Sequence, residues 1–63
     1  MKREFIKMDN NIFEIAEWDY INSVVVLWEV SSFRTINIPM FFLTNPGFQD
    51  AMRIEYVNYE EIT

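Results

Sequence analysis

The sequence predicts a mostly β fold, either a small antiparallel sheet or a partly closed barrel of four to five strands. Turn-forming residues divide the chain into pieces of about 7 to 12 residues, the spacing typical of small β proteins, and the clearest turn is Asn45-Pro46-Gly47. Most residues between the turns are β-branched or aromatic, which favours strands. With 63 residues the chain can build only one small core, so we expect a single domain over residues 1–63.

The N-terminal third is expected to form a hairpin, in which residues 4–8 pair with residues 12–20 around a turn at residues 9–11. The apolar face of the second segment changes side along its length, from Phe13 and Ile15 to Trp18 and Tyr20. A β-bulge near Ala16 would explain that change. The alternative for residues 12–20 is a helix capped by Asn11, and the strand is preferred.

Residues 24–30 are predicted to form a central strand with both faces mostly covered, because they are almost continuously apolar. A hairpin at Ser31-Ser32 would lead into a partner strand over residues 33–43. Alternate residues of that segment share one apolar face, namely Ile36, Ile38, Met40 and Phe42. Pro39 cannot donate a backbone hydrogen bond, so it places this segment at a sheet edge or a bulge.

The C-terminal segment fits two templates. As a strand, it alternates Met52, Ile54 and Tyr56 with charged residues. As a helix that begins near Pro46 after an Asn45 cap, it carries one apolar stripe made of Phe48, Ala51, Met52, Tyr56 and Tyr59. The alternative fold is therefore α+β, with one helix at about 46–59 or 12–20 packed on a three- to four-stranded antiparallel sheet. Residues 60–63 are expected to be a frayed acidic tail.

The residues that most enzymes use are missing. The chain has no histidine, no cysteine and one glycine. Without histidine and cysteine, no Ser-His-Asp or Cys-His arrangement or disulfide can be built, and a structural zinc site is not expected. One glycine cannot form a phosphate-binding loop. Three carboxylates near residues 14–19 are more typical of a solvated face than of an acid–base pair. We therefore predict that the protein is not an enzyme and uses no metal or cofactor.

Charge and hydropathy limit the partners. Ten acidic against five basic residues give a net charge of −5, which disfavours direct binding to nucleic acid. The apolar runs are far shorter than the roughly 20 residues that a membrane helix needs, and no export signal is readable at the N-terminus. We expect a cytoplasmic protein that does not bind membranes.

A binding role remains. The chain has six phenylalanines, three tyrosines and two tryptophans, which are more than so small a core can hold. Some of them should therefore lie at an interface, either between the two copies of a homodimer or with another protein. Carboxylates beside them could imitate the phosphate charge that nucleic-acid-binding enzymes recognise. The candidate partner-binding residues are Glu14, Glu17, Trp18, Asp19, Tyr20, Phe48, Glu55 and Tyr59.

Two functional hypotheses follow. In size, acidity, composition and lack of catalytic groups the chain resembles small phage-encoded host-takeover or anti-defence proteins. That resemblance implies a non-catalytic protein that binds and inhibits or modulates a larger protein, such as a nucleic-acid-binding protein, as a DNA mimic would. The alternative is a structural or assembly subunit that acts through self-association.

Overall fold

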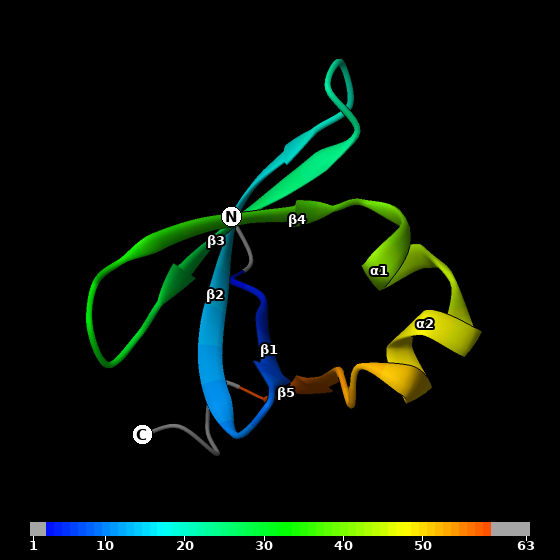
Figure 1. Ribbon diagram of the computed structural model, residues 1–63. Coiled ribbons are helices and arrows are strands. Elements are labelled where there is room, and N and C mark those ends of the chain that lie inside the picture. Colours follow the sequence, from blue (N-terminus) through cyan, green and yellow to red (C-terminus); the bar gives the residue numbers. More distant parts are fainter. Residues whose placement is uncertain (1–2, 59–63) are drawn as a thin grey trace.

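A computed structural model describes residues 3–58 of the chain, which form an antiparallel sheet and two short helices (Figure 1). In chain order the elements are β1 (Phe5–Met8), β2 (Asn11–Asp19), β3 (Val24–Glu29), β4 (Thr35–Pro39), α1 (Phe41–Thr44), α2 (Pro46–Ala51) and β5 (Glu55–Val57). The prediction of a mostly β fold with four to five strands is confirmed. The predicted tail at residues 60–63 lies outside the described residues.

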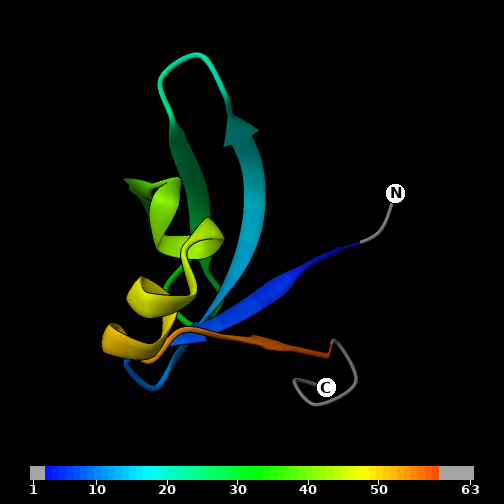
Figure 2. The ribbon, with the colours of Figure 1, turned by 90° about the vertical axis from the view of Figure 1, so that its right-hand side faces the viewer.

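The five strands form one open sheet in the order β4-β3-β2-β1-β5, with every neighbouring pair antiparallel. Strands β4 and β5 therefore lie at opposite edges, and α1 and α2 bridge the space between them, so that the described chain closes into a ring in projection (Figure 1). The hairpin of β2 and β3 extends beyond this ring (Figure 2).

Tight turns join the first four strands. Asp9 and Asn10 both have positive φ, 52° and 66°, which is the geometry of the two-residue turns that match the twist of antiparallel strands. Asparagine and aspartate tolerate this left-handed conformation better than most residues do. The predicted turn at residues 9–11 therefore joins β1 to β2, and the predicted hairpin around Ser31-Ser32 joins β3 to β4.

Strand β2 contains the predicted bulge. Ile15 lies opposite Leu27 and Glu17 lies opposite Val26, so the register shifts at Ala16. The extra residue reverses the alternation of side chains along the second half of the strand. The alternative of a helix over residues 12–20 is wrong, because residues 12–19 belong to strand β2, which pairs with β1 on one side and with β3 on the other.

The strand expected over residues 33–43 is shorter, because the chain leaves the sheet after Pro39. Met40 is in the right-handed helical region and Phe41 begins α1. The predicted edge position of Pro39 is confirmed, since β4 is the last strand of the sheet. The prediction that this strand continues to residue 43 is wrong. The rings of Phe41 and Phe42 pack against Phe48 of α2 instead of alternating across a sheet.

The helix expected over residues 46–59 forms only in its first part. Asn45 caps α2 by accepting hydrogen bonds from the backbone N–H groups of Gly47 and Phe48, and Pro46 takes the first helical position, as predicted. The helix ends at Ala51 because Arg53, with φ of 55°, reverses the chain, and the N–H of Ile54 donates to the carbonyl of Gln49. The chain then forms β5, so the strand template holds only for residues 55–57.

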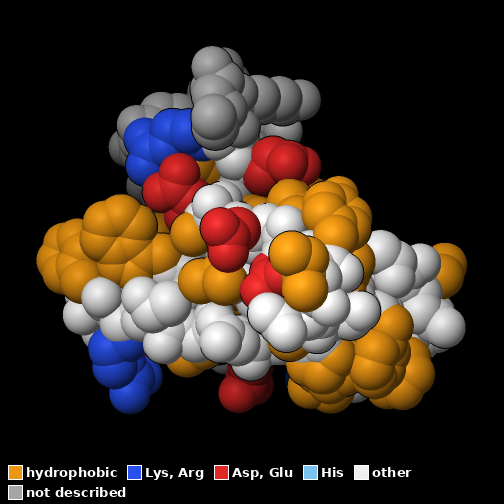
Figure 3. Space-filling view, turned by 90° about the horizontal axis from the view of Figure 1, so that it is seen from above, with side chains coloured by type: hydrophobic (Ala, Val, Ile, Leu, Met, Phe, Trp, Pro, Cys, Tyr) orange, Lys and Arg blue, Asp and Glu red, His pale blue; other side chains and the backbone are white. Residues whose placement is uncertain are grey.

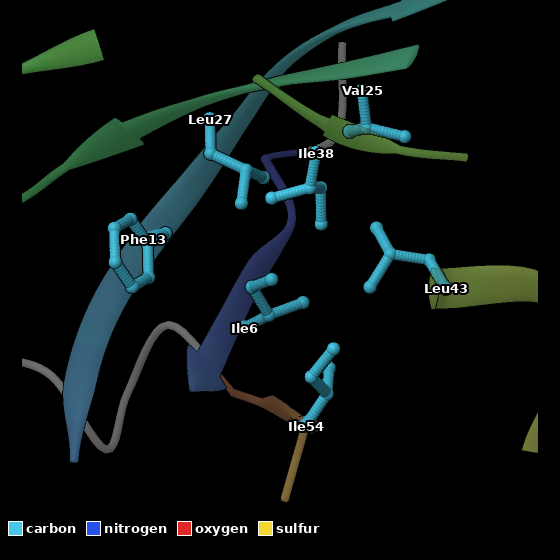
Figure 4. Close-up of a cluster of buried hydrophobic side chains, with 7 residues drawn as sticks. All are labelled: Ile6, Phe13, Val25, Leu27, Ile38, Leu43 and Ile54. Atoms are coloured by element: carbon cyan, nitrogen blue, oxygen red, sulfur yellow. The ribbon is translucent and has the colours of Figure 1, made fainter. Parts of the chain in front are cut away.

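One hydrophobic core lies inside the curve of the sheet. Seven buried side chains point toward one another, and they come from all four long strands, from α1 and from the segment before β5: Ile6, Phe13, Val25, Leu27, Ile38, Leu43 and Ile54 (Figure 4). Strand β3 is covered on this inner face only. Its other face carries Val24 and Val26, which are half-buried, and Trp28, which is 44% exposed, so the expectation of two covered faces is wrong.

Candidate protein-binding surface

The bulge in β2 brings three carboxylates to one face of the sheet. Glu14, Glu17 and Asp19 lie opposite Trp28, Val26 and Val24 of β3, so all three point to the outer face. Without the extra residue Ala16, the odd spacing between Glu14 and Glu17 would place them on opposite faces. The same shift keeps Ile15 and Trp18 on the inner face, where both pack against the core.

An apolar strip runs beside the carboxylates. It consists of the outward residues of β3, which are Val24, Val26 and Trp28. The Trp28 ring lies 5.9 Å from the ring of Phe33, centroid to centroid, and Phe33 is 73% exposed. We call the outer surface formed by Glu14, Glu17, Asp19, Val24, Val26, Trp28 and Phe33 the acidic face. In a view from above, acidic side chains lie between apolar groups at the two ends of the molecule (Figure 3).

Glu14 is held in place by Arg3. The guanidinium donates from Nε and Nη2 to the two carboxylate oxygens, at 2.9 and 3.0 Å, and it also lies 5.1 Å above the ring of Phe5. The hydrogen bonds from Arg3 hold the pKa of Glu14 below its ordinary value. This two-pronged ion pair fixes Glu14 at the end of the acidic face nearest Trp28, and it neutralises part of its charge.

Asp19 ends β2 and shapes the turn that follows. Its carboxylate accepts hydrogen bonds from the side-chain amide and the backbone N–H of Asn22, at 2.9 and 3.1 Å, which lower the pKa of Asp19. The turn presents Tyr20 and Ile21 at the tip of the β2–β3 hairpin, and Ile21 is 94% exposed. Asp19 therefore contributes negative charge to the acidic face and also stabilises an apolar tip beside it.

Glu29 follows Trp28 in β3 and lies on the inner face, behind the Trp28 end of the acidic face. It is the one buried charged residue among those described, and it accepts hydrogen bonds from the Ser32 hydroxyl and from the Arg34 guanidinium, the latter at 3.1 Å from Nη2. These bonds, led by that from Ser32, lower the pKa of Glu29. They fix the β3–β4 turn, in which Phe33 has φ of 60° and so projects its ring toward Trp28.

The predicted site residues fall in several places. Glu14, Glu17 and Asp19 share the acidic face, whereas Trp18 is half-buried against the core and Tyr20 is at the hairpin tip. Glu55 lies in β5, where it is opposite Lys7 of β1, and Phe48 lies on α2. Tyr59 lies outside the described residues.

Sequence reasoning missed Trp28 as a surface residue, and it did not include Phe33 among the candidate partner-binding residues. The alternation of Val24, Val26 and Trp28 was a signal for a shared face, but only the cross-strand register shows that this face is the outer one.

Three phenylalanines form a second exposed aromatic group on the helices. The centroid of the Phe41 ring lies 5.1 Å from that of Phe42 and 4.7 Å from that of Phe48, both edge-on, and Phe42 stacks on Phe48 at 5.5 Å. Phe41 and Phe48 remain about half exposed. Such contacts add roughly 0.5–1.5 kcal/mol each beyond burial, which explains how two helices of four and six residues hold together.

A polar cavity of about 400 Å³ lies between the β1–β2 turn, the end of α2 and the start of β5. Its charged lining mixes both signs, with Lys7 and Arg53 against Asp9, Asp50 and Glu55. Within residues 3–58 no group of three or more histidine, cysteine or acidic side chains could hold a metal ion. The cavity therefore favours neither an anionic nor a cationic ligand, and the acidic face remains the stronger candidate site.

In comparisons with known proteins, no family model, curated protein or solved structure matches the chain. Over the part of the chain that the structure describes, no helix is long and apolar enough to cross a membrane.

Proposed function

We propose that the protein is a small non-catalytic factor that binds a larger protein through its acidic face and thereby inhibits or modulates it. The observation that carries the proposal is the juxtaposition, set by the cross-strand register, of Glu14, Glu17 and Asp19 with an exposed Trp28–Phe33 pair. Tryptophan and other aromatic anchors supply most of the binding energy in protein interfaces, and charged rims choose the partner.

The partner that this chemistry fits is a basic protein. Glu17 and Asp19 are two residues apart on the same strand face, a spacing of about 7 Å, and the chain as a whole carries a net charge of −5. A nucleic-acid-binding protein presents lysine and arginine at its binding surface. A row of carboxylates can occupy such a surface, which would make the protein a competitor of nucleic acid in the cytoplasm, as in an anti-defence factor.

The test is capture of partners from a host lysate by the intact protein at low and moderate salt, followed by competition with nucleic acid for the captured partner. We expect a basic partner whose binding weakens steeply with salt, because the contacts are ionic. Glu17→Lys should weaken that binding by on the order of tenfold or more, since it places like charge against the partner. Glu17 suits the test because it is exposed and makes no side-chain hydrogen bond or ion pair within residues 3–58.

The matched control is Asp50→Lys on α2, which makes a charge change of the same sign and similar size away from the acidic face. It should leave binding nearly unchanged if the acidic face makes the contact. Equal losses for both variants would show that only net charge matters. Unchanged binding by Glu17→Lys would refute the acidic face as the contact surface.

A second candidate function is an assembly subunit that acts through self-association. The uncharged run of residues 35–49, which covers β4, α1 and most of α2, favours it, because it carries the half-exposed Phe41 and Phe48. Light scattering after size exclusion separates the two functions. A modulator should stop at monomer or dimer, whereas an assembly subunit should form larger closed or open arrays.

A further inference from the structure

One segment of the chain has no charged residue. From residue 35 to residue 49 the chain contains no lysine, arginine, aspartate or glutamate, although these residues make up 24% of the whole chain. This uncharged segment covers β4, α1 and most of α2. Two copies of a protein with a net charge of −5 repel each other, and the repulsion is least where neither copy presents a charge.

The segment includes an unprotected sheet edge. Strand β4 is the outermost strand, and among the described residues no other strand pairs with its outer side. Bonds from the Glu29 N–H to the Arg34 carbonyl and from the Met40 N–H to the Ser23 carbonyl set the ladder, so Ile36 and Ile38 bond to β3. The backbone groups of Thr35 and Asn37 consequently point away from the sheet. Edges of this kind are usually blocked by charged side chains, and β4 has only Pro39.

We propose that β4 is a self-pairing edge, at which a second copy of this chain adds its own β4 antiparallel about a two-fold axis at Asn37. The sequence around that point is symmetric, with Ile36 and Ile38 on either side of Asn37. The two-fold places Asn37 opposite Asn37 of the second copy, Ile36 opposite Ile38, and Thr35 opposite Pro39.

This register satisfies most of the backbone groups that β4 exposes. The two Asn37 residues exchange both backbone hydrogen bonds, and each Thr35 N–H donates to the carbonyl of the opposing Pro39. Because Pro39 has no N–H, the Thr35 carbonyl receives no hydrogen bond from the opposing strand and is left to water at the end of the pairing. The missing donor of Pro39 is thus placed at the end of the pairing and not at its centre.

The exposed rings at the two ends of β4 also match. Phe33 precedes the strand and is 73% exposed, and Phe41 follows it and is 46% exposed. Antiparallel pairing about Asn37 brings Phe33 of each copy to the end of the strand where Phe41 of the other copy lies. The proximity of the two rings gives the isologous contact an apolar component at each end.

The pairing closes at two copies. The other sheet edge, β5, has three residues and carries Glu55, so it does not offer a second uncharged edge. The dimer would be a continuous ten-stranded sheet with both acidic faces on one side, because the two-fold axis of an antiparallel pair is perpendicular to the sheet. Five strand spacings separate β2 from its copy, about 24 Å along the sheet. This inference goes beyond the proposed function and stands without it.

The test measures the oligomeric state of the intact protein by sedimentation over concentrations up to about 1 mM. Wild type should be a dimer that dissociates on dilution. Asn37→Asp and Asn37→Lys each place two like charges across the two-fold, so each should raise the dissociation constant by on the order of tenfold or more. An equimolar mixture of the two variants should recover the dimer, because unlike charges then meet.

The matched control is Asn58→Asp, the same charge change at an exposed residue beyond β5, and it should dimerise like wild type. Circular dichroism checks that each variant is folded, and Thr35→Lys, which also charges the edge, replaces an Asn37 variant that is not. A wild type that is monomeric at about 1 mM or larger than a dimer would overturn the proposal. So would equal weakening by Asn58→Asp, or a mixture that stays monomeric.

Discussion

At the scale of single residues, left-handed backbone positions decide where elements end. Within residues 3–58, five residues other than glycine have positive φ: Asp9, Asn10, Ser23, Phe33 and Arg53. The first two are residue types that tolerate this conformation, so their turn was predictable from the sequence. Arg53 gives no such signal. It occupies the position after a helix where glycine is usual, and for this reason the end of α2 at Ala51 could not be predicted.

Replacement of Arg53 by glycine should stabilise the protein. Because φ is 55° at this position, the Cβ of arginine is strained there, and Arg53→Gly should raise the free energy of unfolding by about 1 kcal/mol. Urea unfolding followed by circular dichroism measures the change. Arg53→Ala is the control for charge, since it removes the guanidinium but keeps Cβ. Equal stabilisation by both variants would assign the gain to charge and not to backbone strain.

At the scale of elements, the bulge at Ala16 is the feature on which the acidic face depends. The change of apolar side within residues 12–20 was enough to predict a bulge near Ala16. It was not enough to predict that Glu14 faces Trp28, because this pairing also requires the register of β3. Helix α1 was missed for a related reason. Its four residues continue the apolar alternation of β4, and only ring contacts with Phe48 favour a helix.

Deletion of Ala16 should abolish the fold. Without the extra residue, the second half of β2 would turn Glu17 and Asp19 toward the core and Trp18 toward solvent. The burial of unpaired carboxylates would cost on the order of 3 kcal/mol or more, a large part of the stability of a small domain. Circular dichroism and urea unfolding test this. Ala16→Gly, which keeps the residue count and the register, should remain folded, and a folded deletion variant would contradict the assigned role of the bulge.

At the scale of the whole molecule, charge is divided between two sides. The acidic face carries carboxylates on β2, while residues 35–49, which cover β4, α1 and most of α2, carry none. The sequence predicted an acidic protein with surplus aromatics, and the structure sorts these into an acidic face with Trp28 and Phe33 and an uncharged side with Phe41 and Phe48. The sorting could not be predicted from local pattern, since it depends on which strand pairs with which.

The same carboxylates should make stability depend on pH. Glu14, Asp19 and Glu29 all have pKa values below their ordinary values of 4.5, 3.8 and 4.5 in the folded protein. A lowered folded pKa adds stability that is fully present above the ordinary value and is lost as the pH falls through the folded value. The urea midpoint should therefore be steady from neutral pH to about 5 and then fall.

Glu29→Gln isolates the contribution of Glu29, whose carboxylate accepts from Ser32 and Arg34. This variant should be less stable than wild type at neutral pH, and its midpoint should fall less on acidification. A midpoint that falls as steeply as that of wild type would show that Glu29 does not contribute to the acid sensitivity.

The pairing of β1 with β5 has a consequence for how the chain folds. The three hairpins of β1 to β4 join neighbouring segments, whereas Phe5 pairs with Val57, almost the full described length away. Loop-closure entropy favours early formation of local hairpins and delays such distant contacts. The meander that carries the acidic face can thus assemble first, and docking of β5 becomes the late step that completes the native state. A nascent chain would accordingly present its acidic face before its last strand has joined the sheet.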